Sequence, residues 1–114
     1  MPKAVITGVA DTAVGKVEGS TSLGLQSEAA LAALADAGLS GADVDGLLAA
    51  YSFTAPHPML ASVLGENLGI MPSYSVALQA GGATACVMVM QAMALVEAGY
   101  CRHVLCVTGD NRLT

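Results

Sequence analysis

The sequence predicts an α/β fold built around a mostly parallel sheet. Short, strongly apolar runs alternate along the chain with longer segments rich in alanine and leucine, and glycines end the longer segments. Buried strands of a parallel sheet read as short apolar runs, and a glycine directly after a helix is a common stop signal. The expected order is β-α-β-α-β-α-β, with right-handed crossovers between the strands.

The short apolar runs are the expected strands, which cover residues 4–10, 46–51, 73–78 and 104–108. The segments between them are the expected helices, which cover residues 23–37, 58–68 and 83–98. Ser20, Thr21 or Ser22 can cap the first helix, and Gly38 stops it. In that helix Gln26 is expected to face water.

The composition is unusual for a small free-standing domain. Hydrophobic residues make up 54% of the chain and charged residues only 11%. A domain of this size exposes much of its surface and normally carries more charge, so residues 1–114 are expected to be the N-terminal half-domain of a longer polypeptide. The third helix is apolar nearly all round, which predicts that it lies buried between two sheets of a layered sandwich.

Charge and cysteine usage exclude several kinds of function. The net charge is −5, and the four basic residues are scattered, so no basic surface for nucleic acid is expected. The three cysteines form no C-x-x-C pair, and no histidine stands at metal-ligand spacing. Neither a metal site nor a disulfide framework is therefore indicated, and a reducing, cytoplasmic setting is expected.

A long uncharged stretch runs from Glu66 to Glu97 and raises the question of a membrane span. Gly69, Pro72 and the glycine pair at 81–82 interrupt it. A strand, a turn and a buried helix explain such a pattern better than one spanning helix, so no membrane span is expected.

The turn Gln-Ala-Gly-Gly-Ala-Thr, residues 79–84, is the most informative segment for function. It joins the third expected strand to the uncharged third helix, so the free N–H groups of the helix N-terminus are aimed at the turn. Enzymes use such a turn to hold an activated nucleophile. Here the turn holds Gly81 and Gly82, so a site built for a nucleophile lacks one.

The order and spacing of these segments resemble the N-terminal part of a thiolase-superfamily protein, above all the sterol-carrier-protein and lipid-transfer types. The resemblance covers essentially the whole chain. The segments that carry it are Thr7-Gly8 of the opening strand, the helix over residues 28–38, the unit from Gly81 to Gly99, and residues 104–111. It implies a thiolase-like layered sandwich, with this chain supplying most of one β-α-β-α-β-α-β half.

The family pattern at the third strand–helix turn is Cys-Ala-(Ser/Thr)-Gly, in which the Cys takes the acyl group from an acyl-CoA. That Cys position falls on Gly82, and Ala83-Thr84 match the next two residues. Glycine cannot form an acyl-enzyme. Cys86 is a weak substitute nucleophile, because a packed core residue is the expected role for it. The candidates for lining a ligand are Gly81, Ala83, Thr84 and His57.

The resemblance implies an acyl-CoA thioester as substrate, no covalently bound cofactor, and a homodimer. The leading hypothesis is retro-aldol cleavage of a β-hydroxyacyl-CoA in lipid or steroid degradation, because this chemistry needs no covalent acyl-enzyme. Some family members of this kind work with a small OB-fold partner that carries a zinc ribbon. The general base is expected outside this chain, and the 114 residues alone are expected to be inactive.

Three alternatives remain open. The first is an acetyl-CoA acetyltransferase that uses another thiol, and the second is a non-catalytic subunit that pairs with an active partner. A plain Rossmann nucleotide-binding domain is the third, and it fits less well because Gly8, Gly15 and Gly19 do not form G-x-G-x-x-G. Outside the turn, His103 and Asp110-Asn111 are expected to have structural roles, the latter in a turn after the last strand.

Overall fold

A three-stranded parallel sheet forms the centre of the computed structural model, which describes residues 3–13, 19–52 and 59–110. Strand β1 (Gly46–Ala50) lies between β2 (Tyr74–Leu78) and β3 (Val104–Val107). Gly46 is in register with the first residue of both neighbours, so all three strands end at the same edge of the sheet. The predicted α/β class is confirmed.

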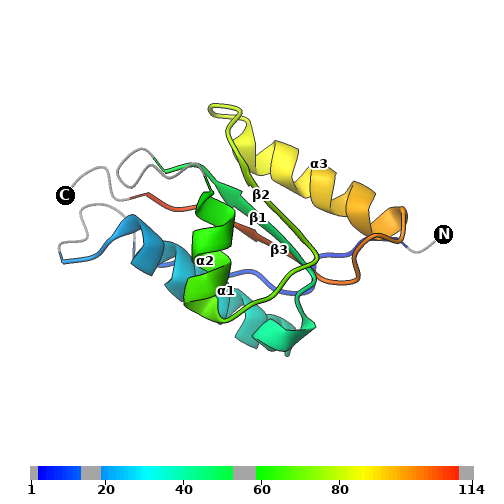
Figure 1. Cartoon of the computed structure of the whole chain (residues 1–114), viewed down its shortest axis with the longest axis horizontal. Coiled ribbons are helices and arrows are strands. Elements are labelled where there is room, and N and C mark those ends of the chain that lie inside the picture. The colour runs from blue at the N-terminus through cyan, green and yellow to red at the C-terminus, as the bar shows by residue number, and fades with distance from the viewer. Residues whose placement is uncertain (1–2, 14–18, 53–58, 111–114) are drawn as a thin grey trace.

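Helices cover both faces of this sheet, which gives three layers (Figure 1). Helices α1 (Ser22–Ala37) and α2 (Leu60–Leu68) pack on one face, and α3 (Thr84–Glu97) packs on the other. A short 3₁₀ turn, η1 (Gly41–Asp43), leads from α1 into β1. Every residue of β1 is buried, as expected for a strand between two helical layers.

The ends of α1 follow from its sequence. The Thr21 side chain accepts a hydrogen bond of 2.9 Å from the Gly24 N–H, so Thr21 is the N-cap among the three candidates. Gly38 ends the helix with a φ of 72°, a conformation that glycine adopts without strain. The expectation that Gln26 faces water is wrong, because this side chain is fully buried against the sheet.

Helix α2 begins at Leu60, and its predicted first residue, Pro58, lies outside the described residues. Gly69 ends α2 with a φ of 71°, as the sequence indicated. The other helices and strands lie within one or two residues of their expected bounds. Differences of this size are usual at the frayed ends of elements.

The expected strand over residues 4–10 is wrong, since residues 3–13 belong to no strand. Within the described chain β3 pairs with β1 alone, and its free edge forms no ladder with residues 3–13. This segment is held against α1 instead. A Cβ at Gly8 would overlap the Ala33 carbonyl oxygen, and the Val9 N–H donates to the Asp36 carboxylate at 2.9 Å.

Helix α3 is not buried on all sides, contrary to expectation. Only Met88 and Leu95 are buried, whereas Met90 is 69% exposed. The described residues contain one sheet, so α3 has one face to pack against. A second sheet on its outer face stays a prediction. None of the described helices has the length and apolar character needed to cross a bilayer.

Asp45 ties the starts of β1 and β3 together. Its carboxylate accepts hydrogen bonds from the backbone N–H groups of Arg102 and His103, at 2.9 Å each. Burial, the largest single influence, raises the pKa of this carboxyl, but hydrogen bonds from the backbone N–H groups of Arg102, His103 and Asp45 itself, together with the charge of His103, hold the pKa below its ordinary value of 3.8. The structural role expected for His103 fits this arrangement, because its backbone is one of the donors.

Asp45→Asn should destabilise the protein by about 1–2 kcal/mol at neutral pH, because charge-assisted hydrogen bonds are lost at a partly exposed site. The folded-state pKa is lowered, so the stabilisation is present above the ordinary aspartate pKa and is lost as the pH falls through the folded-state value. Urea unfolding across this pH range measures the difference. A gap between the two proteins that persists undiminished in acid would contradict this assignment.

Candidate functional site

Three segments meet at the carboxyl edge of the sheet. The turn over residues 79–83 follows β2, Tyr51-Ser52 follow β1, and Gly109-Asp110 follow β3. Because the strands are parallel and in register, these segments leave the sheet at the same edge. Ligands of open α/β sheets bind outside the carboxyl ends of the strands, so this edge is the place to look for a site.

The turn between β2 and α3 is closed by its own hydrogen bonds. The Ala83 N–H donates to the Ala80 carbonyl at 3.2 Å, and the Thr84 N–H donates to the Gly81 carbonyl at 3.2 Å. The Thr84 hydroxyl accepts from the Ala80 N–H at 2.9 Å and donates to the Gly81 carbonyl at 2.7 Å. The Thr84 hydroxyl is therefore used to close the turn, while the N-cap of α3 is Ala83, which makes no side-chain cap hydrogen bond.

The two glycines of the turn have different constraints. Gly81 has a φ of 59°, in the left-handed region that glycine occupies without strain. Gly82 is not among the glycines with positive φ, and an added Cβ there would meet no atom within 4 Å. The fold therefore requires glycine at residue 81, but it accepts a side chain at residue 82.

Cys86 is exposed, so the expectation that it packs in the core is wrong. It lies in the first turn of α3, on the side of the helix that the described residues leave uncovered. Cys101 is buried, and burial together with the nearby charge of Asp45 raises the pKa of its thiol, which keeps it protonated and unreactive. His57, the remaining candidate for lining a ligand, lies outside the described residues.

A second polar cluster at this edge was missed by the sequence analysis. Ser22 and Gln26 of α1 both donate to the Gly109 carbonyl, at 3.1 and 2.9 Å, and the Ser52 hydroxyl donates to the Asp110 carboxylate at 2.9 Å. The available signal was the spacing of Ser22 and Gln26, which places them on one face of a helix. All three donor side chains are buried.

This cluster fixes the backbone after β3. Gly109 is packed so closely that an added Cβ would lie 3.2 Å from Gln26 Cγ. Gln26 Oε1 is buried and accepts no hydrogen bond within the described part of the chain. The donors of the cluster bind the Gly109 carbonyl and the Asp110 carboxylate. These hydrogen bonds agree with the turn-forming role expected for Asp110.

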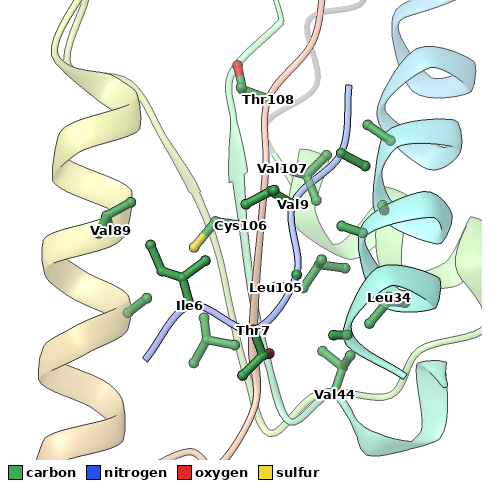
Figure 2. Close-up of a pocket in the computed structure, with 18 of the residues that line it drawn as sticks. Ile6, Thr7, Val9, Leu34, Val44, Val89, Leu105, Cys106, Val107 and Thr108 are labelled. Atoms are coloured by element: carbon green, nitrogen blue, oxygen red, sulfur yellow. The ribbon is translucent and has the colours of Figure 1, made fainter. Parts of the chain in front are cut away.

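A groove with a cavity volume of about 730 Å³ runs between residues 4–13 and β3, and Gly109 and Asp110 at the carboxyl edge are among the residues that line it. Figure 2 shows Ile6, Val89 and Cys106 on the α3 side of this groove, and Leu34 and Val44 on the α1 side. Its walls are mainly apolar, and no residue of the turn at 79–84 lines it. The groove and the turn are therefore separate features.

No protein-family model matches the chain. Two curated proteins are similar to it. A steroid side-chain-cleaving aldolase of Thermomonospora curvata is 38% identical over 108 residues, which is 95% of this chain and 27% of that protein. A 17-hydroxy-3-oxo-4-pregnene-20-carboxyl-CoA lyase of Mycobacterium tuberculosis is 38% identical over 97 residues, which is 85% of this chain and 24% of that protein. The chain thus spans about a quarter of the length of both relatives.

Solved structures give the same result for the fold. A chain of the Ltp2–ChsH2(DUF35) aldolase superposes with a TM-score of 0.79 and 37% identity, covering 98% of this chain and 28% of that one. The 3-oxoacyl-[acyl-carrier-protein] synthase III of Aquifex aeolicus superposes with a TM-score of 0.73 at 21% identity, over 83% of this chain and 31% of that one, and so supports the fold alone.

The parallel sheet and its covering helices match those of thiolase-like proteins, and this chain shares the thiolase-superfamily fold. Within the superfamily it is similar in sequence to the steroid side-chain-cleaving aldolases. The resemblance inferred from the sequence is confirmed. The assignment of residues 1–114 to one half of a longer protein stays a prediction.

Gly81→Ala and Gly82→Ala should have opposite effects on stability. The first forces alanine into a left-handed conformation and should cost about 1–2 kcal/mol. The second restricts only the unfolded chain and should leave stability unchanged or raise it by about 0.5 kcal/mol. Urea unfolding of the two variants beside the wild type measures both effects. Equal destabilisation would show that residue 82 is also held in a conformation reserved for glycine.

Proposed function

We propose that the protein carrying this chain cleaves a carbon–carbon bond of a β-hydroxyacyl-CoA by a retro-aldol reaction, in lipid or steroid degradation. The observation that carries the proposal is Gly82. We assign this position to the family nucleophile. Its backbone accepts a side chain, yet it holds none. A reaction without a covalent acyl-enzyme is consistent with this substitution.

The names of the two relatives supply the substrate class. In a 17-hydroxy-3-oxo-4-pregnene-20-carboxyl-CoA the hydroxyl is on C17 and the CoA carboxyl is on C20, the neighbouring carbon. The hydroxyl is therefore β to the thioester, which is the arrangement a retro-aldol reaction requires. At 38% identity this chain is similar enough for the same substrate class to be the first one to test.

The reaction balances as a proton transfer and a bond cleavage. A base takes the proton of the β-hydroxyl, the C–O bond becomes a carbonyl, and the bond between the α- and β-carbons breaks. Its electron pair passes into the thioester enolate, which is then protonated at the α-carbon. The products are a ketone or aldehyde and a shorter acyl-CoA.

This chain's share of the chemistry is stabilisation of the enolate oxygen. The N-terminus of α3 carries partial positive charge toward the turn at 80–83, which suits a developing oxyanion. Gly81, Gly82 and Ala83 have no ionisable group, and the Thr84 hydroxyl is already bonded within the turn. We therefore place the general base outside this turn, in a part of the protein beyond these residues.

The assembly and location are part of the same proposal. We infer a homodimer acting in the cytoplasm on an acyl-CoA, without a bound cofactor. A partner protein is supported by the similar solved structure, which is named as a complex of Ltp2 with ChsH2(DUF35). An OB-fold partner with a zinc ribbon is the kind we propose to seek first.

An acetyl-CoA acetyltransferase is the second candidate, favoured by the exposure of Cys86 in the first turn of α3. The two functions differ in their dependence on this thiol.

The complete protein, purified with its partner, should convert a β-hydroxyacyl-CoA to a ketone or aldehyde and a shorter acyl-CoA, followed by mass spectrometry. Because no thiol takes part, iodoacetamide treatment should leave the rate within about twofold, and Cys86→Ser should do the same. Cys101→Ser serves as the control for a buried thiol. Loss of turnover in Cys86→Ser alone would favour the acetyltransferase.

Gly82→Cys should give the protein a new acceptor for acyl groups. The thiol would stand at the N-terminus of α3, where nucleophilic cysteines are activated, and the open space at residue 82 should admit it. Incubation with acetyl-CoA followed by intact-mass measurement should show one acetyl group per subunit. Gly82→Ser, of similar size, should stay unmodified. The absence of any adduct on Gly82→Cys would mean that residue 82 is not the nucleophile position.

A further inference from the structure

The structural contrast between the two turn glycines raises the question of why residue 82 has no side chain. Gly81 needs its positive φ of 59°, whereas Gly82 does not have a positive φ and its Cβ position is open. Substitution by alanine at such a position normally raises stability. A glycine at a position where the fold accepts a side chain points to a requirement for space there.

The open position is not filled by its neighbours in the turn. Residues 80–83 are all exposed, and none has a side chain larger than a methyl group. The first larger residue is Thr84, whose hydroxyl is drawn back into the turn by its hydrogen bonds to Ala80 and Gly81. The described chain therefore leaves free the volume that a nucleophilic side chain would take at residue 82.

A nucleophile at residue 82 would approach the carbonyl carbon of the bound thioester. The α-carbon is one bond from that carbonyl, so a group attached to the α-carbon lies next to the same volume. The pregnene substrate named for the mycobacterial relative is branched at this carbon, since C20 carries both C17 and C21. The space released at residue 82 thus matches a feature of that substrate class.

We propose that Gly82 is a specificity-determining residue, whose missing side chain makes room for a substituent on the α-carbon of the acyl-CoA. The inference rests on the proposed function and adds to it the residue that selects α-branched substrates. Any side chain at residue 82 should exclude the branch by steric overlap, while a substrate without the branch still fits.

The test compares the complete wild-type protein, with its partner, to Gly82→Ala and Gly82→Val. The substrates are 3-hydroxybutyryl-CoA and 2-methyl-3-hydroxybutyryl-CoA, which differ by one methyl group on the α-carbon. Gly82→Val should lower kcat/KM for the methyl-branched thioester by about 10- to 100-fold more than for the unbranched one, the range expected for one misplaced methyl group. Gly82→Ala should show a smaller difference of the same sign.

Ala98→Val, an exposed position at the opposite end of α3, is the matched control and should affect both substrates equally. Thermal unfolding of every variant excludes a folding defect as the cause. Equal losses for the two substrates in Gly82→Val, or no loss for either, would overturn the role of Gly82 while leaving the aldolase proposal intact.

A binding measurement keeps the two proposals separable if turnover is absent. Propionyl-CoA and acetyl-CoA differ by the same methyl group on the α-carbon. By calorimetry, Gly82→Val should weaken propionyl-CoA binding about tenfold more than acetyl-CoA binding. This difference without cleavage of any β-hydroxyacyl-CoA would support the role of Gly82 and reject the aldolase reaction. Equal binding losses, or no binding by the wild type, would reject the role of Gly82.

Discussion

The central strand β1 is the constraint on which the rest of the structure depends. It is hydrogen-bonded to a parallel strand on each side and is buried on both faces, with Leu47 and Leu48 inaccessible to solvent. A strand in this position needs helices above and below it. Because the three strands are parallel and in register, their carboxyl ends lie at one edge of the sheet. The turn at 79–83, Ser52 and Asp110 are positioned by this sheet.

Buried polar groups at that edge hold the backbone more than they offer a reactive group. Ser22 and Gln26 are buried and donate to the Gly109 carbonyl, while the more exposed Thr84 hydroxyl closes the glycine turn. Breaking the buried hydrogen bonds would leave unpaired polar groups in a low-dielectric interior, so they favour one arrangement of the backbone. The Cβ position of Gly82 at this edge is open. The chemistry proposed for the protein therefore depends on backbone N–H groups and space, with the base supplied from elsewhere.

Helix α3 and the segment before α1 show where local pattern and tertiary structure diverge. The apolar circumference of α3 predicted burial on every side, and the apolar run at residues 4–10 predicted a strand. An apolar helix becomes buried on every side only if other elements pack on every side, and an apolar segment becomes a strand only if it pairs with another strand. In the described chain α3 meets one sheet, and residues 4–10 lie across a groove from the free edge of β3 without forming a ladder with it. Burial and strand formation are properties of pairs of surfaces, so a sequence segment alone does not decide them.

The sequence by itself determined the α/β class, the order of six of its seven expected elements, the glycine stops at Gly38 and Gly69, and the resemblance to the thiolase superfamily. These depend on hydrophobic period and turn chemistry, which act over a few residues. Only the tertiary structure decided that Gln26 is buried, that Cys86 is exposed, and that residue 82 is open while Gly81 is held by its φ. Those properties depend on which atoms lie nearby in space. The hydrogen bond from Gln26 of α1 to the Gly109 carbonyl, for example, joins residues that are far apart in the sequence, and a local sequence pattern does not reveal it.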